Sequence, residues 1–373
     1  MTMIRIKHIH TLAELDAIEK IWTDLERVDG GPSIFQSWIW NRTWCEHVLG
    51  SRKRARLDVR VVEDGAGRTL AILPLFEEAL AGPIARLTQF LGHRMSYHND
   101  VLLADPKSSE LAERVVATLL EDLGPRTVLH LRHLNGESLF TKQLLASQWA
   151  EPQCLRVLIQ ADPSITDQQM RFGRSTRKTF RSQVNQLNRR FDCEYRVLRG
   201  EDFPEVFDEL VDLHQRRFTS AARSTLLAGP NLAFLKAAAS KLSNRGNFEI
   251  VQLRADGATI AAALMAHDKR RYFQVNFGFD PEFARYSPMR LLLTETMRRG
   301  FDDLGCEIYD LGPGYEAYKF KWSPIVGTNY FCCRGGSGLY AKSVAALYRA
   351  AFRRRLPPTP QTGVRVHGGN NPV

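Results

Sequence analysis

The chain has 373 residues and a mass of 42.4 kDa, which is long for a single hydrophobic core, so two domains are expected. Hydrophobic residues make up 44% and charged residues 25%, a composition that excludes a disordered, collagenous or disulfide-dense chain. The longest apolar run, Ile260 to Ala266, is far shorter than the ~20 residues of a membrane span. The N-terminal residues lack the basic and then apolar pattern of a signal peptide, so a cytoplasmic location is expected.

The net charge of +10 is concentrated in two segments. Residues 171–199 contain nine Lys or Arg against two acids, and residues 342–355 contain five Lys or Arg and no acid. Between 171 and 190, apolar residues recur at helical spacing opposite a row of cations, which predicts an amphipathic helix with a cationic face. That face could simply be solvated, or it could bind an anionic partner such as a phosphate-bearing cofactor, tRNA or a membrane surface.

The C-terminal part is predicted to be a basic tail helix over 336–356 and a disordered end over 357–373, which is rich in Pro, Gly and Asn. The basic stretch 342–355 could dock on the body of the protein or lie against an anionic membrane surface. The second arrangement would place a cytoplasmic protein peripherally on the inner face of the membrane.

Residues 1–160 are predicted to form one mixed α/β domain. A capping box at Thr11-Leu-Ala-Glu14 marks a helix start, because the Thr hydroxyl and the Glu carboxylate satisfy amides that lack helical partners there. Two apolar runs around a Gly-rich turn predict a β-hairpin. In chain order the predicted elements are a strand at 3–9, helices at 11–28 and 33–49, hairpin strands at 57–62 and 69–76, a helix at 111–123 and a strand at 128–131.

Residues 161–335 are predicted to form a second domain of the same kind. After the basic helix come two more helices, and then an antiparallel meander with strands at 248–253, 259–266 and 272–279. Because helices precede a meander in both halves, we predict a mixed α/β (α+β) fold. It would have two tandem domains, each a mixed, mainly antiparallel sheet flanked by helices.

Residues 277–322 carry the most informative pattern. Ser287 followed by Pro288 predicts a helix start, since Ser is a capping residue and Pro is tolerated at the first helical position. An apolar stripe follows, Gly305 ends the helix, and a strand is predicted at 306–311. The order strand, helix, strand predicts a parallel, right-handed crossover.

This topology gathers several chemical groups at one sheet edge. The strand end at Phe279, the helix start at Ser287 and the loop after Asp310 should lie together there. A helix start offers unpaired amides and a positive dipole end, which suit a pyrophosphate or a carboxylate. Gly312 and Gly314 permit a tight turn that returns an acid, a phenol and two ammonium groups to this edge: Glu316, Tyr318, Lys319 and Lys321.

These four side chains could supply a general base, a general acid and stabilisation of an oxyanion or phosphate. Three of them, and Asp310, also have a structural alternative. Glu316 could simply pair with Lys319. Tyr318 could be a core aromatic residue, and Asp310 could cap the turn that follows it.

No metal site is predicted. The six cysteines show no Cys-x-x-Cys spacing, and the histidines lack the spacing of metal ligands. Cys332 and Cys333 are neighbours in a strand-like run, so their side chains should point to opposite faces, where they cannot share a disulfide or a metal ion.

Several motifs resemble those of one family, the CelD-like acetyltransferases of the GNAT superfamily, which are associated with cellulose and exopolysaccharide biosynthesis and related to FemAB peptidyltransferases. The motifs are Tyr286-Ser-Pro288, Tyr309-Asp-Leu-Gly-Pro-Gly314, Glu316-Ala-Tyr-Lys319 with Trp322, Ile34-Phe-Gln-Ser-Trp38 and the basic stretch 178–190. The resemblance implies two GNAT-like domains, with the first chiefly structural. It also implies acyl transfer from a thioester or an aminoacyl donor to an amine or hydroxyl.

The resemblance further assigns roles to residues. Acetyl-CoA or another acyl-CoA, the expected co-substrate, would place its phosphates against Arg285, Ser287, Met289, Arg290 and Leu291. Catalysis would fall to Glu316, Tyr318, Lys319 and Lys321. The acceptor, a small molecule or glycan precursor, would contact Asn276, Asp310 and Gly314.

Two features depart from the family pattern. In the GNAT pyrophosphate loop counted from Arg285, the small positions are Pro288 and Arg290, and Met289 stands where Gly is expected. Phe320-Lys321 begins like a Fem motif but does not continue as one. Two alternatives therefore stay open. One is a Fem-like transferase that uses aminoacyl-tRNA, and the other is a non-catalytic GNAT-like module that binds a polysaccharide-synthesis partner or a membrane.

Overall fold

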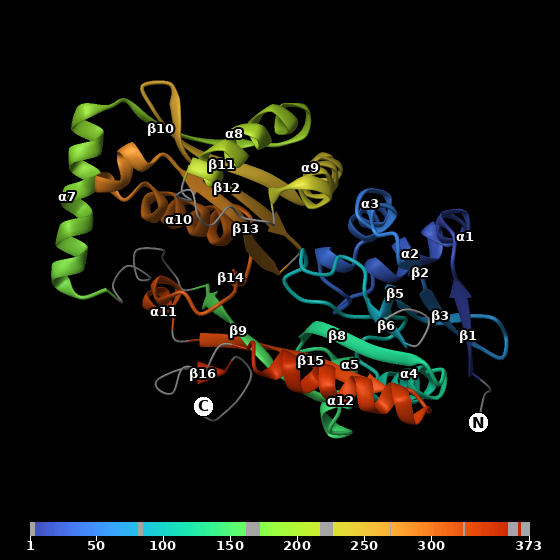
Figure 1. Cartoon of the computed structure of the whole chain (residues 1–373). Helices are drawn as coiled ribbons and strands as arrows, with labels where there is room; N and C mark the ends of the chain where they lie inside the picture. The colour runs from blue at the N-terminus through green and yellow to red at the C-terminus, as the bar shows by residue number, and fades with distance from the viewer. Residues whose placement is uncertain are drawn as a thin grey trace. The chain divides into compact units, whose positions relative to one another are not determined.

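The computed structural model describes residues 4–80, 85–161, 172–216, 227–268, 270–323, 325–356 and 365–366 (Figure 1). The chain divides into two compact units, unit 1 (1–155 and 328–359) and unit 2 (156–327 and 360–373). Both contain mixed sheets flanked by helices, which confirms the predicted fold class. Among the described helices, none is long and apolar enough to cross a membrane.

The division into units differs from the predicted linear one at residues 160 and 335. The chain passes between the units inside two long strands, β9 (Ala150–Gln160) and β15 (Ile325–Gly335). The predicted tail helix, observed as α12 (Leu339–Arg353), therefore belongs to unit 1. Of the end predicted to be disordered, residues 365–366 form strand β16 against β15, and the rest lies outside the described residues.

The strands of unit 1 form two sheets. One has the order β1 (Ile4–Ile9), β3 (Val59–Asp64), β4 (Thr69–Leu73), β7 (Leu102–Leu103). In the other, residues 328–335 of β15 precede β8 (Thr127–Asn135), β6 (Ala85–Phe90), β5 (Leu75–Leu80) and β2 (Ala55–Leu57). The main helices besides α12 are α1 (Leu12–Ala17), α2 (Glu19–Glu26), α3 (Trp38–His47), α4 (Ser109–Glu121) and α5 (Leu139–Ala146).

Local signals in unit 1 act as the sequence predicts. The capping box forms, with Thr11 accepting from the Glu14 amide and Glu14 accepting from the Thr11 amide. The single predicted helix up to Val28 is two helices that meet at Ile18. Cys332 packs in the core beneath α4 and α5, whereas Cys333 packs beneath α12, so the two thiols do point to opposite faces.

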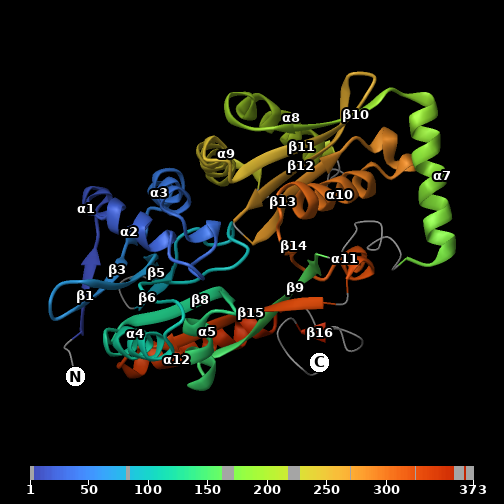
Figure 2. The same ribbon diagram turned by 180° about the vertical axis from the view of Figure 1, so that it is seen from behind.

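Unit 2 contains the predicted meander. Its sheet has the order β10 (Cys193–Leu198), β11 (Phe248–Ala255), β12 (Ala258–His267), β13 (Arg271–Phe279), β14 (Ile308–Pro313) and then residues 156–160 of β9. The helices are α7 (Arg174–Arg190), α8 (Phe203–Arg216), α9 (Gly229–Asn244), α10 (Pro288–Arg298) and α11 (Ala317–Trp322). Helices α8 and α9 cover one face of the meander and α10 covers the other (Figures 1 and 2).

Strand β13 and helix α8 approach closely at Gly278. A methyl carbon at this position would lie 2.3 Å from the backbone nitrogen of His214 and 2.5 Å from the backbone carbonyl carbon of Leu213. Any larger residue must therefore push the helix away from the sheet.

We predict that Gly278→Ala lowers the free energy of unfolding by about 2 to 3 kcal/mol, because the added methyl group meets backbone atoms that cannot rotate away. Gly173→Ala is the matched control, since a methyl group there has no neighbour within 4 Å. Urea denaturation measures both variants. Equal stability of the two would contradict the close contact of α8 with β13.

Candidate functional site

The candidate site lies where two neighbouring parallel strands of unit 2 diverge. Strands β13 and β14 pair over three residues each, from Arg271 with Ile308 to Phe273 with Asp310, and then separate. This confirms the predicted parallel crossover. The ends of both strands and the start of α10 consequently share one edge of the sheet, and beyond the three pairs β13 and β14 no longer bond to each other.

The start of α10 differs from the expected amide-rich helix end. Ser287 has a left-handed backbone (φ 55°), and its hydroxyl bonds to the side chain of Gln183 on α7 at 3.0 Å instead of capping the helix. The amides of Arg290 and Leu291 donate to the Ser287 carbonyl at 3.0 and 3.2 Å. Since Pro288 has no amide hydrogen, little of this helix start is left to bind phosphate.

Arg290 is enclosed by aromatic rings rather than presented to solvent. Its guanidinium lies 4.3 Å from the ring centres of Phe172 and Phe180 and 5.9 Å from that of Trp322. Burial lowers the pKa of this guanidinium. The contact with Trp322, at the end of α11, brings the start of α10 and the loop after β14 together as expected, but side chains fill the space between them.

The turn after β14 is held by Lys319. Its buried ammonium group donates to the carbonyl oxygens of Gly312 at 3.3 Å and Pro313 at 2.9 Å, and pairs with Glu316 at 3.0 Å. Gly314 has φ 132°, and a methyl carbon there would lie 2.3 Å from a carboxylate oxygen of Glu316. Lys319 and Gly314 thus shape the turn, as the structural alternative anticipated, and the donors of Lys319 are already used.

Asp310 is fully buried. One carboxylate oxygen accepts from the Gly312 amide at 2.8 Å and the other pairs with the equally buried Arg156. This corrects the expectation that Asp310 contacts substrate, because neither oxygen faces solvent. Its carboxylate instead fixes the turn to the strand β9 beside it.

The remaining predicted catalytic and substrate residues keep partial access. Tyr318 is half-buried close to Tyr309. Burial raises the pKa of Tyr309, and the nearby Tyr318 raises that pKa further. Glu316 and Lys321 are exposed. Asn276, on the divergent part of β13, is half-buried, and its side-chain oxygen accepts from the Phe277 amide at 2.7 Å. Arg285 is exposed and stacks on Tyr286.

His214 is a candidate that the sequence did not reveal. It lies at the end of α8, and its Nδ1 is 2.9 Å from the carbonyl oxygen of Phe277 on β13. A carbonyl only accepts, so this bond assigns the proton to Nδ1 and leaves Nε2 as the basic nitrogen. Because 63 residues separate the two partners, no spacing rule could pair them.

A pocket of about 660 Å³ opens beside this edge. Its apolar wall comes from α7, Phe191, Leu253 and Leu291, and its polar wall includes Arg189 and Arg190. Arg190 also lies 3.4 Å from the Tyr286 hydroxyl. Leu291 is thus the one predicted cofactor residue that lines a described pocket.

With this geometry in place, the relatives can be compared. Residues 174–320, from α7 into α11, match the family model described as "Acetyltransferase (GNAT) domain". This segment is therefore similar to a GNAT-type acetyltransferase domain. No curated protein matches the chain. The resemblance to the CelD-like family is not among these findings.

Solved structures are similar over most of the chain. FemX is 12% identical, with 88% of this chain and 96% of that chain covered and a TM-score of 0.55. The C-terminal domain of a putative lysylphosphatidylglycerol synthetase from Agrobacterium fabrum is 14% identical, with 91% and 96% covered and a TM-score of 0.53. A conserved protein of unknown function from Bacteroides thetaiotaomicron is 13% identical, with 89% and 99% covered and a TM-score of 0.52. Likeness at these identities shows a common fold.

Residues 174–320 would fit an acyl-CoA phosphate only through a different set of groups from the expected one. The amides of Arg290 and Leu291 are engaged and the Arg290 side chain is enclosed. Exposed cations remain on both sides of Tyr286, namely Arg285 and Arg190. Side-chain charge rather than a helix N-terminus would therefore hold the anion.

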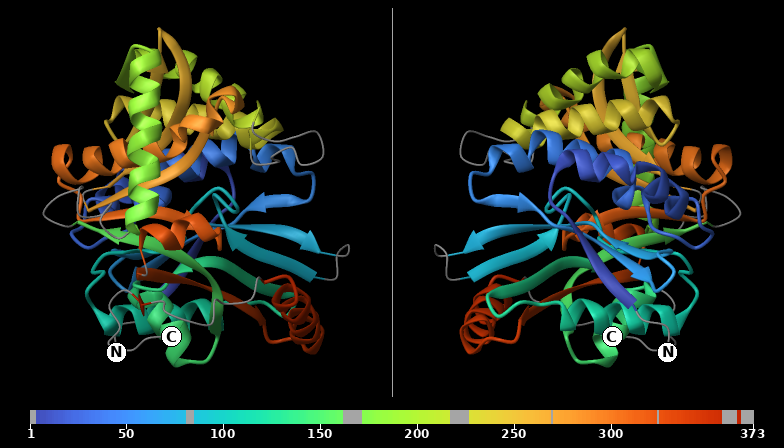
Figure 3. Two further views of the ribbon diagram at one scale, coloured as in Figure 1. Left: turned by 90° about the vertical axis from the view of Figure 1, so that its left-hand side faces the viewer. Right: turned by 90° about the vertical axis from the view of Figure 1, so that its right-hand side faces the viewer.

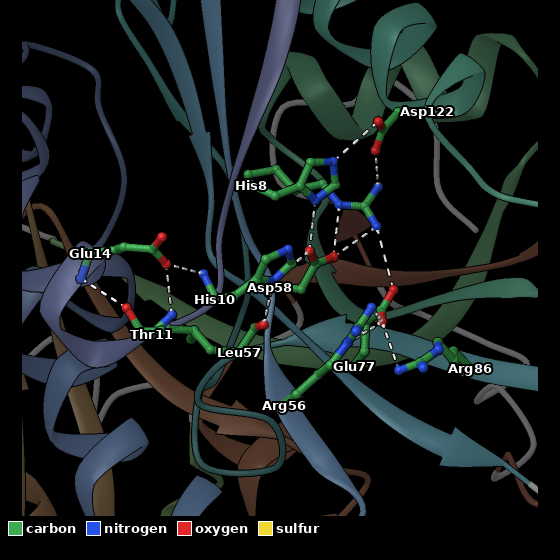
Figure 4. Close-up of polar contacts among 11 residues, drawn as sticks. His8, His10, Thr11, Glu14, Arg56, Leu57, Asp58, Glu77, Arg86 and Asp122 are labelled. Atoms are coloured by element: carbon green, nitrogen blue, oxygen red, sulfur yellow. Dashed lines mark hydrogen bonds and ion pairs between the residues drawn. The ribbon is translucent and has the colours of Figure 1, made fainter. Parts of the chain in front are cut away.

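One group of side chains in unit 1 has the composition of a metal site: His8, His10 and Asp58, with their ligand atoms within 4.8 Å of one another (Figure 4). The His8 nitrogens already contact Asp58 at 2.8 Å and Asp122 at 3.2 Å. Arg60 donates to both of these carboxylates. The hydrogen bonds to Asp122 and Asp58 raise the pKa of His8 to about 9 against the opposing effect of burial, so His8 carries a proton at neutral pH.

We predict that His8 stabilises unit 1 in a pH-dependent way. Because its pKa is raised from 6.5 to about 9 on folding, the stabilisation is complete below pH 6.5 and is lost as the pH rises through 9. His8→Gln should lower the free energy of unfolding by about 1 to 2 kcal/mol at pH 6 and by little at pH 10. Denaturation curves between these values test this, with His47→Gln as control, and an equal loss at both pH values would contradict it.

Proposed function

We propose that this protein is an acyltransferase that moves an acyl group from acyl-CoA to an amine or hydroxyl acceptor. The observation that carries the proposal is the divergence of β13 from β14 inside the segment that matches the GNAT domain. Diverging strands of this kind can leave room for a ligand at the edge of a sheet. The acceptor would reach this edge between Asn276 and Tyr318.

The reaction requires two proton transfers, one from the acceptor to a base and one from an acid to the leaving thiolate. The acceptor nitrogen or oxygen forms a bond to the acyl carbon and loses a proton, while the carbon–sulfur bond breaks and the thiolate is protonated. His214 Nε2 is a candidate base, since its Nδ1 is fixed to Phe277. Tyr318 is the candidate acid, and exposed Glu316 could act through water.

A second candidate is a Fem-like transfer from aminoacyl-tRNA. Two observations favour it. The start of α10 has few free amides for a pyrophosphate, and α7 exposes Arg174, Lys178 and Arg181 along one side. A regular row of cations suits the phosphates of a nucleic acid. A non-catalytic module is the remaining alternative, and it needs neither donor.

The resemblance to CelD-like proteins suggests the pathway. Under this proposal the acceptor is a glycan precursor or another small molecule of cell-envelope or exopolysaccharide synthesis, and the reaction takes place in the cytoplasm. A hydroxyl or amine on such an acceptor has the chemistry that the proposed proton transfer requires.

The donor is tested by adding millimolar CoA, acetyl-CoA or aminoacyl-tRNA and measuring thermal unfolding. We expect stabilisation by CoA, and about fivefold weaker CoA binding for Arg285→Ala, because an exposed charge contact contributes roughly 1 kcal/mol. Arg174→Ala is the control for loss of charge alone. Stabilisation by aminoacyl-tRNA but not by CoA would favour the Fem-like candidate, and no response to either donor would favour the non-catalytic one.

The catalytic assignment is tested by turnover of a donor that passes the first experiment. His214→Asn retains a donor near the Phe277 carbonyl but removes the basic nitrogen, so we expect kcat to fall about 100-fold with little change in stability. Tyr318→Phe should reduce kcat by a similar factor. Full activity of both variants would show that the acid and base lie elsewhere.

A further inference from the structure

Helix α12 of unit 1 exposes large apolar side chains along its outer side. Leu339 is 83% exposed, Leu347 73% and Tyr340 48%. The two leucines are eight residues apart, which places them on the same side of a helix about 12 Å from one another. Single exposed apolar side chains are common on protein surfaces. Here they form a row on one helix, which is typical of an interaction site.

These leucines are not needed to hold α12 in place. The opposite side of the helix packs on unit 1, where Ala341 and Ala345 are buried. Tyr348 and Phe352 contact the ring of His130 on β8, with centroids 4.8 and 5.2 Å apart. Figure 3 shows α12 lying on the outer side of the strands it covers. The helix therefore has two apolar sides, one buried and one open.

Positive charge surrounds the open side. Residues 342–355 contain five cations and no acid. Arg349 and Arg353 pair with Glu151, whereas Lys342, Arg354 and Arg355 are exposed and form no ion pair among the described residues. Apolar side chains beside unpaired cations are typical of helices that lie in the plane of a membrane interface. No described helix could cross the membrane.

We propose that α12 docks this protein on an anionic lipid surface, with Leu339, Tyr340 and Leu347 entering the interface and Lys342, Arg354 and Arg355 contacting lipid phosphates. The positive charge of α12 favours an anionic lipid surface over other partners. A second copy of the helix would bring like charges together, whereas a nucleic acid would offer no apolar surface for the leucines. Each phosphate contact adds attraction that salt weakens. This inference does not depend on the proposed acyl transfer.

The test is sedimentation of the full chain with vesicles. We expect binding to vesicles that contain phosphatidylglycerol, weak binding to pure phosphatidylcholine, and loss of binding at high salt. The double variant Leu339→Ser with Leu347→Ser should bind at least tenfold more weakly, without loss of stability, since both side chains are exposed. Ile21→Ser, which removes an apolar side chain 41% exposed on α2, is the matched control and should bind as the unchanged chain does.

A charge variant separates the two contributions. Lys342→Gln with Arg354→Gln and Arg355→Gln should reduce binding to anionic vesicles and its dependence on salt, while the leucine variant should keep its dependence on salt. Equal vesicle binding by the leucine variant and the unchanged chain would overturn the proposal. So would light scattering that shows a dimer which the leucine variant separates, because a second copy would then occupy the surface.

Discussion

The short parallel ladder between β13 and β14 determines the rest of unit 2. Beyond these three residue pairs, each strand is paired with a different neighbour. Strand β13 continues along β12, and β14 pairs with β9. The buried pair of Arg156 with Asp310 lies at the last rung of the ladder, where it ties β14 and the turn after it to β9. Removing one member would leave an uncompensated buried charge, so the divergence is built into the core and does not depend on a ligand.

The divergence also explains why glycines and one lysine gather after β14. The chain must turn sharply once it leaves the ladder, and the carbonyl groups of residues 312 and 313 both lie within hydrogen-bonding distance of Lys319. Lys319 satisfies them with its ammonium group, and Glu316 balances that charge over Gly314. The pattern that resembles a catalytic motif is therefore partly a scaffold. This shifts the chemical candidates to half-buried Tyr318 and to His214, which is buried with its Nδ1 held on the Phe277 carbonyl.

Helix α7 has a comparable double use. Its inner side carries Phe180 and Leu187, and Phe180 with Phe172 encloses Arg290 at the start of α10. Its outer side remains cationic. The helix therefore shields the start of α10 while it offers charge to a partner. The charged side chain at this helix start, Arg290, is enclosed by an aromatic residue of the same helix that carries the exposed cations.

Much of the architecture could be predicted from the sequence because its signals are local. The capping box at Thr11, the helix start at Pro288, the meander strands and the opposite orientation of Cys332 and Cys333 all follow from spacing within a few residues. The site itself was predicted only as far as its edge of the sheet. Motif spacing could not distinguish a lysine that braces a turn from one that meets a substrate, since both uses need the same residue at the same position.

The sequence by itself determined the fold class, the parallel crossover and the places where cations accumulate, because helix and strand periods and charge are properties of neighbouring residues. Only the tertiary structure decided which of those groups keep access. Asp310 pairs with Arg156, which is 154 residues away in the sequence, and His214 bonds to the carbonyl of Phe277, which is 63 residues away. Aromatic rings surround Arg290. Burial depends on contacts between distant segments, and no local pattern records which segments those are.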